Sequence, residues 1–210
     1  RESPFVGLKQ FQYIFTMPSF RTAFVNTMII SFFKIILSIL VPLILSLMLN
    51  EVTKSWFKRS VQTIVFIPYF FSWAILAGMI LEIFAYDGII NNTMMHLFGM
   101  EPTAFLVSNK YFRTIIIGSD VWKGMGYNTV LLLAAITNVD PTLYEAAQVD
   151  GAGRWKQVLH VTLPSILPMV AVLTVLGLGN ILNAGFEQIL IMYNPTVERT
   201  VDILLSLIHI

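Results

Sequence analysis

The chain has no cysteine and little charge. Only 12% of its 210 residues are Asp, Glu, Lys or Arg, about half the share that soluble domains usually carry. The absence of cysteine excludes a disulfide scaffold, thiolate metal sites and cysteine nucleophiles, and it leaves the cellular compartment undecided. A net charge of +1 provides no basic field for a nucleic acid partner, and the sequence has no acidic tail.

The sequence also lacks the residue clusters of an enzyme or a metal site. It contains no glycine-rich phosphate loop and no H-E-x-x-H pattern. Its three histidines, His96, His160 and His209, are isolated, and we expect each to be an ordinary loop or interface residue rather than a ligand. The sequence therefore predicts a protein that performs no covalent chemistry and holds no metal or cofactor of its own.

Apolar residues, in contrast, are abundant: 56% of the chain is hydrophobic and the mean hydropathy is +0.75. A spanning helix needs roughly 20 apolar residues, and runs of that length occupy about 23–49, 60–84, 111–137 and 162–187. These runs are too long for strands, and an open sheet edge is not stable in lipid. We therefore predict an all-α fold, a polytopic membrane helical bundle with about four spans, in which residues 1–210 form one transmembrane domain.

The segments between these runs differ in charge. Residues 1–21 are amphipathic and rich in aromatic residues, a pattern that suits a membrane interface, and residues 85–110 are nearly neutral. Residues 50–59 are short and basic, and this density of positive charge favours the cytoplasmic side. The total numbers of Lys and Arg on the two sides are nearly equal, so charge alone leaves the orientation open.

The loop at 138–161 is the most polar internal part of the chain. Asp140 and Pro141 predict a helix start, with Asp as the N-cap and Pro at the first helical position. Asp150 and Gly151 predict its end, because glycine takes the left-handed conformation without steric cost. Residues 152–160 are then predicted to form a second short helix.

Two interpretations of this loop are open from the residues alone. A surface of small side chains, Ala146, Ala147 and Ala152, suits a groove on another protein, whereas an amphipathic loop helix suits lipid headgroups. The first helix has few large apolar residues, which favours a protein partner.

The spacing in this loop resembles a known signature. E-A-A, three residues, G, nine residues, an aliphatic residue, one residue and L-P is typical of the membrane subunits of binding-protein-dependent ABC importers. The matching residues are Glu145, Ala146, Ala147, Gly151, Val161, Leu163 and Pro164. Val161 stands where isoleucine is usual, which changes nothing in the chemistry.

Other segments resemble the carbohydrate branch of the same family. They are VGLKQFQYIF at 6–15, FVNTMIIS at 24–31, FIPYFFSWAI at 66–75, DGIIN at 87–91, DVWKGMGYN at 120–128 and GFEQ at 185–188. The resemblance covers nearly the whole chain and implies about six spans in the intact subunit. The chain begins at Arg1 and ends within an apolar run, so we interpret it as a fragment of that subunit.

The resemblance implies a function and a set of partners. The chain is expected to be a multi-pass permease subunit in the inner (plasma) membrane of a prokaryote, where it moves a sugar or oligosaccharide into the cytoplasm by alternating access. Separate ATPase subunits, which bind ATP and Mg²⁺, receive a cytoplasmic coupling helix between the last two spans. The other expected partners are a second permease subunit, an extracytoplasmic solute-binding protein and membrane lipid. The residues expected to couple to the ATPase are Glu145, Ala146, Ala147, Asp150, Gly151, Leu163 and Pro164.

Three other functions are the alternatives to this assignment. An ABC permease for a non-sugar solute, such as a peptide or an amino acid, is compatible with the loop motif, and only the sugar-type segments argue against it. A secondary transporter needs internal repeats, which the sequence does not show. A membrane-embedded enzyme needs clustered His, Asp or Glu within its spans, which are also missing.

Polar residues within the apolar runs are candidates for a substrate pathway, because burying them in a membrane is costly. These candidates are Asp120, Trp122, Lys123, Asn128, Asn180, Asn183 and Glu187. Asp120 and Lys123 lie three residues apart and are expected to neutralise each other partly. Lys34 is expected to pair within the bundle. The alternative for all of them is hydrogen bonding that only holds the helices together.

Overall fold

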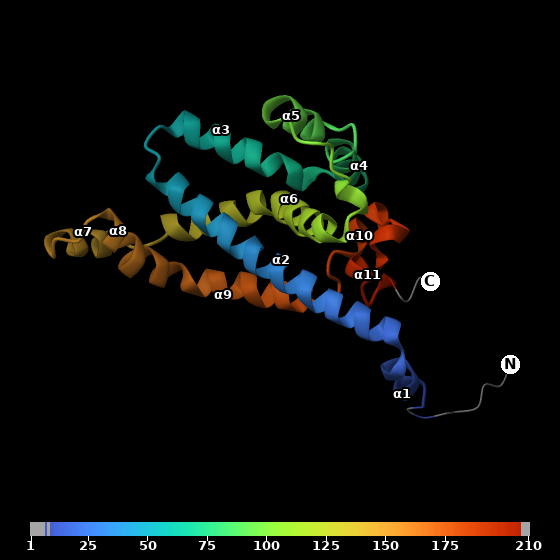
Figure 1. Ribbon diagram of the computed structural model, residues 1–210. Helices are drawn as coiled ribbons and strands as arrows, with labels where there is room; N and C mark the ends of the chain where they lie inside the picture. Colours follow the sequence, from blue (N-terminus) through green and yellow to red (C-terminus); the bar gives the residue numbers. More distant parts are fainter. Residues whose placement is uncertain (1–6, 8, 207–210) are drawn as a thin grey trace. The chain divides into compact units, whose positions relative to one another are not determined.

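The computed structural model describes Gly7 and residues 9–206, and this part of the chain is helical and contains no strand (Figure 1). The all-α prediction is therefore confirmed. Residues 1–6 and 8 of the proposed interfacial segment, and His209, lie outside the described residues. The α-helices are α1 (Lys9–Thr16), α2 (Pro18–Glu51), α3 (Ser55–Phe66), α4 (Trp73–Ile83), α5 (Ile89–Phe98), α6 (Asn109–Thr137), α7 (Pro141–Val149), α8 (Arg154–Gln157), α9 (Leu163–Gly179), α10 (Phe186–Met192) and α11 (Glu198–Val201). Shorter turns of helix are η1 (Ile67–Phe70), η2 (Phe105–Val107), η3 (Val158–Thr162) and η4 (Pro195–Val197).

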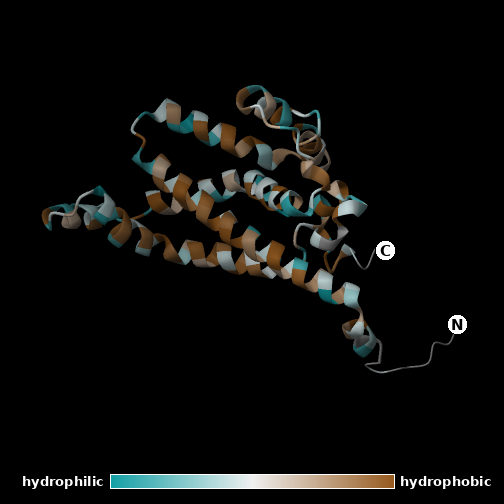
Figure 2. Ribbon diagram, viewed as in Figure 1, coloured by the Kyte–Doolittle hydropathy of each residue, from teal (hydrophilic) through white to brown (hydrophobic). Residues whose placement is uncertain are grey.

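Two helices in the described part of the chain are long and apolar enough to cross a membrane. They are α2 and the continuous helix Arg154–Gly179, which includes α8, η3 and α9. Figure 2 shows both helices in brown over most of their length. The pair Ser55–Phe70 and Trp73–Ile83 meets the same criterion only as one broken span. Helix α6 covers the predicted run at 111–137, but its internal polar residues make it too hydrophilic to meet the criterion.

We expected the second predicted run, 60–84, to form one continuous helix, but the structure shows a break in it. Helix α3 ends at Phe66, the tight turn η1 follows, and Phe71 is extended, with φ −81° and ψ 142°. Pro68 lies in η1 and has no N–H for the α-helical hydrogen-bond ladder, which explains why the helix is interrupted here.

The fourth predicted run, 162–187, also has different ends. The helix already begins at Arg154, so residues 152–160 do not form a separate short helix, and it ends at Gly179 rather than near 187. The turn η3 is a π turn and leads directly into Pro164. A π turn absorbs the hydrogen-bond mismatch of a proline without ending the helix. At the other end, Ala184 and Gly185 adopt positive φ values of 49° and 78° before α10 begins.

The chain divides into two compact units. The first comprises residues 1–32, 73–117 and 181–210, and the second comprises residues 33–72 and 118–180. Helices α2 and α6 therefore contribute to both. In the first unit α10 packs against α4, and a polar network holds the chain after α10. Its centre is Arg113, which donates to the Thr200 carbonyl and, over 2.7 Å, to Asn26 Oδ1.

The second unit contains the loop and most of the polar candidates. Two close contacts define its packing. Gly177 of α9 faces Ile35 of α2, since a Cβ added there would lie 3.3 Å from the Ile35 side chain. Gly126 of α6 lies against the backbone of α3, and a Cβ added there would overlap the Val65 carbonyl and Phe66 Cα. Small residues allow membrane helices to approach this closely.

The contact at Gly126 leads to a prediction about stability. Gly126→Val is expected to force α3 and α6 apart and to destabilise the protein by about 1–3 kcal/mol, the usual cost of overpacking. The thermal unfolding temperature of the purified protein measures this effect. Gly124→Val on the same helix is the matched control, because open space surrounds that position within the described residues. Equal unfolding temperatures for the two variants would show that the close approach is wrong.

Candidate functional site

Helix α7 begins as its sequence predicts. Asp140 is the N-cap, and its carboxylate accepts a hydrogen bond of 2.9 Å from the backbone N–H of Thr142. This hydrogen bond lowers the pKa of Asp140, because it stabilises the charged form. Pro141 occupies the first helical position, where its missing N–H costs nothing. The start of α7 is therefore confirmed.

The end of α7 is a Schellman turn. Gly151 has φ +76°, its N–H donates to the Gln148 carbonyl over 3.0 Å, and the N–H of Ala152 donates to the Ala147 carbonyl over 2.8 Å. These two hydrogen bonds satisfy carbonyl groups that the end of a helix leaves unpaired. The predicted stop at Asp150 and Gly151 is confirmed, and the turn depends on a backbone conformation that favours glycine.

A partly buried hydrogen bond connects α7 to the following helix. Tyr144 on α7 and Thr162 in η3 share a hydrogen bond of 2.9 Å between their hydroxyl groups, and Thr162 is 2% exposed. Leu163 and Pro164 follow immediately and begin α9. The parts of the sequence signature that lie far apart in the chain, at 145–151 and 161–164, are thus linked through one side-chain contact.

Helix α7 presents an exposed surface. None of its residues is buried, and Glu145, Ala146 and Val149 are exposed, Val149 to 89%. The exposed valine and alanine of this nine-residue helix are not covered by the described part of its own chain, and Glu145 adds one carboxylate to the same helix. In Figure 2 the α7–α8 region is mostly pale and teal, in contrast to the brown helix that follows it.

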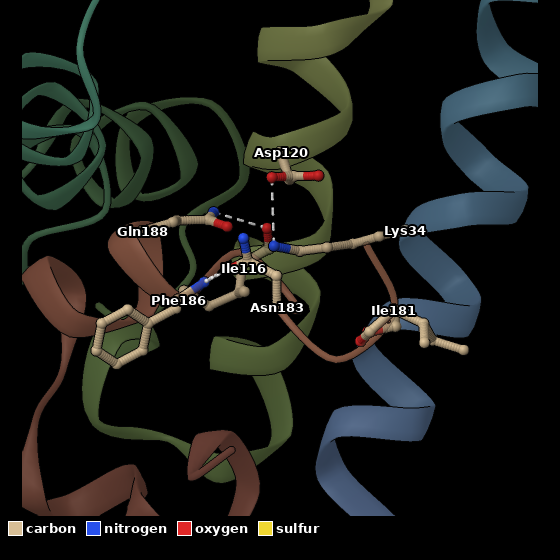
Figure 3. Close-up of polar contacts among 8 residues, drawn as sticks. Lys34, Ile116, Asp120, Ile181, Asn183, Phe186 and Gln188 are labelled. Carbon is tan, nitrogen blue, oxygen red and sulfur yellow. Dashed lines mark hydrogen bonds and ion pairs between the residues drawn. The ribbon is translucent and has the colours of Figure 1, made fainter. Parts of the chain in front are cut away.

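The charged residues inside the spans have partners that differ from those expected. Lys34 Nζ lies 3.3 Å from Asp120 Oδ1, and Lys34 is 6% exposed (Figure 3). The expected pairing of Lys34 within the bundle is therefore confirmed. The expected neutralisation of Asp120 by Lys123 is wrong, because Lys123 donates to the carbonyl groups of Tyr69 and Phe71. Those carbonyls lie where the second span leaves its helix, and the ammonium group supplies N–H donors to them.

Three further candidates lie in the same unit. Asn128 donates to the Ser38 carbonyl over 2.9 Å. It also lines a cavity of about 250 Å³ together with Asn180 and Tyr127. Trp122 is 36% exposed. The structure therefore brings Asn128 and Asn180 together at one cavity, whereas Trp122 is not among its lining residues.

The last two candidates belong to the first unit. The Asn183 side chain accepts a hydrogen bond of 3.2 Å from the Phe186 N–H at the start of α10, and Glu187 is exposed. The neighbouring Gln188 is fully buried and donates to the Ile116 carbonyl over 2.8 Å (Figure 3). Asn183 thus has a local structural role, while the Glu187 carboxylate is available to solvent or a ligand.

Sequence reasoning missed two features of the second unit. Tyr69 and Tyr127 stack with their ring centroids 4.9 Å apart, and an apolar groove of about 490 Å³ lies beside Trp155. The aromatic residues were visible in the sequence, but no periodic pattern connects 69 with 127. Only the break after Pro68 brings the two rings together.

Comparisons with known proteins place this geometry in a family. Residues 38–206 match the family described as "Binding-protein-dependent transport system inner membrane component". The chain is 40% identical over 201 residues to the polygalacturonan/rhamnogalacturonan transport system permease protein YteP of Bacillus subtilis. That alignment covers 96% of this chain and 63% of the permease, so the chain spans less than two thirds of its relative.

Solved structures give the same result. The chain matches a bacterial ABC transporter involved in the import of the acidic polysaccharide alginate with a TM-score of 0.93 and 39% identity, covering 99% of this chain and 73% of the other. A second structure, of a bacterial alginate ABC transporter in complex with an alginate pentasaccharide-bound periplasmic protein, matches with a TM-score of 0.93 and 38% identity, covering 97% and 71%. The helical fold, the loop motif and these matches agree: the chain belongs to the family of binding-protein-dependent transport system inner membrane components.

Proposed function

We propose that the chain is part of the permease subunit of an ATP-driven ABC importer that takes up an oligosaccharide. The observation that carries this proposal is the loop at 138–161, in which Glu145 and Gly151 form an exposed helix with a Schellman end. The names of the similar proteins support the substrate class, since YteP is a permease for polygalacturonan and rhamnogalacturonan and the similar structures import alginate. The chain itself catalyses no reaction, and ATP with Mg²⁺ is bound by separate ATPase subunits.

The loop then acts as the mechanical connection to the ATPase. Helix α7 sits in a cleft of an ATPase subunit on the cytoplasmic side, where the Glu145 carboxylate pairs with a cationic group. Movement of α7 reaches the membrane by two routes, the hydrogen bond from Tyr144 to Thr162 and the short turn at Gly151. Both routes lead into the helix Arg154–Gly179, so a displacement of the loop displaces a whole span.

The extracytoplasmic side of the chain contacts the solute-binding protein, and a second permease subunit is the other partner. With the loop in the cytoplasm of a prokaryote, residues 1–21, 85–110 and those after 190 face the solute-binding protein, and a second permease subunit completes the pathway. Glycans are recognised by aromatic faces together with amides and carboxylates that bond hydroxyl groups. Trp122, Asn128, Asn180 and Glu187 supply these groups, whereas the contacts of Asp120, Lys123 and Asn183 support a role in holding the local structure.

The substrate class is tested with the full-length complex reconstituted in lipid with its solute-binding protein. We expect oligosaccharides from polygalacturonan or alginate to stimulate ATP hydrolysis and ATP-dependent uptake. Stimulation by peptides or amino acids but by no glycan would contradict the sugar assignment. Uptake that follows an ion gradient and needs no ATP would contradict the importer class.

The coupling role of the turn is tested with Gly151→Val. A valine at φ +76° costs about 1–3 kcal/mol of backbone strain, so the Schellman turn is expected to rearrange and transport to fall at least tenfold. Gly153→Ala is the control, because Gly153 has φ −68°, which any residue adopts. Substrate-stimulated ATPase activity and uptake are measured for both variants. Normal coupling in Gly151→Val would refute the role of this turn.

Glu145 gives a second test of coupling that leaves the fold unchanged, because its side chain is exposed. Glu145→Gln is expected to reduce substrate-stimulated ATPase activity at least tenfold, since losing one partner of a buried interfacial charge pair costs about 2–5 kcal/mol. Gln148→Ala, at another exposed position of α7, serves as the control. Co-purification of the ATPase subunits shows whether assembly or only coupling is lost, and unchanged activity would exclude Glu145 from the contact.

The substrate pathway is tested at Glu187. Glu187→Gln keeps the shape of the side chain and removes its charge, so the amount of assembled complex is expected to stay constant while the KM for uptake rises about tenfold, as for one lost charged hydrogen bond. Asn183→Ala is measured beside it, and because Asn183 accepts a hydrogen bond from the Phe186 N–H at the start of α10, it is expected to lower the amount of complex as well. If Glu187→Gln has wild-type kinetics, the residue is outside the pathway.

A further inference from the structure

An apolar groove lies at the point where two spanning helices meet the loop. It has a volume of about 490 Å³ and is lined by Ile44, Leu47, Met48 and Glu51 of α2 and by Arg154, Trp155 and Val158 at the start of the next span. All of these residues belong to the second unit. The five apolar side chains form the walls, and the two charged residues are the only ionisable groups in the lining.

The charged residues of this groove are accessible. Arg154 Nη1 lies 3.5 Å from Glu51 Oε2, and the two side chains are 83% and 47% exposed. An exposed ion pair of this length contributes little to stability, so the guanidinium can exchange its partner. A guanidinium has five N–H donors in a planar fork that matches the oxygens of a phosphate.

The position of the groove indicates lipid rather than a soluble ligand. Glu51 is the last residue of α2 and Arg154 is the first residue of the helix Arg154–Gly179, the two helices that meet the criterion for a membrane span. Trp155 is 81% exposed at this same level, and tryptophan is enriched where a membrane meets water. Lys54, Arg59 and Lys156 are exposed on the segments that adjoin the groove.

We propose that this groove binds an anionic phospholipid, with an acyl chain along Leu47, Met48 and Val158 and the phosphate on Arg154. Basic groups at the cytoplasmic ends of membrane helices attract anionic headgroups, and the sidedness of this site rests on the proposed function. The lipid bridges α2 and the first turn of the span that carries the loop. Bound lipid therefore stabilises the arrangement of Arg154 and Trp155 through which α7 is connected, so anionic lipid increases the coupling of ATP hydrolysis to transport.

The test compares the full-length complex in nanodiscs of phosphatidylcholine alone with nanodiscs that also contain phosphatidylglycerol. Native mass spectrometry after release from the nanodisc measures retained phosphatidylglycerol, a readout that does not depend on transport. Arg154→Gln is expected to weaken retention about tenfold, the ratio for one lost charge-assisted hydrogen bond. Lys156→Gln removes the same charge two residues away, at a position that does not line the groove, and is expected to keep wild-type retention.

A second measurement uses the tryptophan. Lipids with brominated acyl chains quench nearby indoles, and the quenching lost in Trp155→Phe reports on Trp155 alone. We expect the brominated lipid to quench the fluorescence of Trp155 in the wild type. We also expect substrate-stimulated ATPase activity to rise when phosphatidylglycerol is present. Equal loss of retention in Arg154→Gln and Lys156→Gln, or no quenching of Trp155 because an ATPase subunit covers it, would overturn the proposal. Either result leaves glycan uptake, and with it the proposed function, unaffected.

Discussion

A carbonyl group that leaves a helix inside a bilayer must find a donor, because no water is available there. This constraint explains the contacts that Lys123 and Arg113 make with backbone far away in the sequence. Lys123 reaches the carbonyls of Tyr69 and Phe71 at the break in the second span, and Arg113 reaches that of Thr200. Gln188 also donates to a backbone carbonyl, but that of Ile116 lies within the regular helix α6. At the break in the second span and after α10, a long polar side chain from α6 thus reaches the backbone.

The same constraint changes how the polar residues of the spans are interpreted. A charged residue in a membrane helix is by default a functional candidate, yet Asp120, Lys34 and Lys123 are all engaged in contacts within the described chain. Their charge is used to keep helices and turns in place. Glu187 and Trp122 have accessible side chains, and under the proposed function they and the amides at the cavity beside Tyr127 are the residues left for the substrate pathway.

The sequence predicts this molecule well where structure is decided locally. The start of α7 at Asp140 and its end at Gly151 follow from capping and from the left-handed conformation of glycine. The break after Pro68 and the partner of Asp120 do not follow from such local rules. Both depend on which helix lies opposite. The start of the last described span was misplaced for a similar reason. Pro164 is a good signal for a helix start, but η3 lets the helix continue through it from Arg154.

The π turn at η3 has a geometric consequence for the span that follows it. A π turn contains about one residue more than an α-helical turn, and each residue of an α-helix corresponds to about 100° of rotation. The side chains of α9 are therefore out of phase with those of α8, although the backbone between Arg154 and Gly179 is continuous. Trp155 and Leu173 thus do not follow a single helical period. The extra residue sets which face of α9 turns toward Ile35 and which toward lipid.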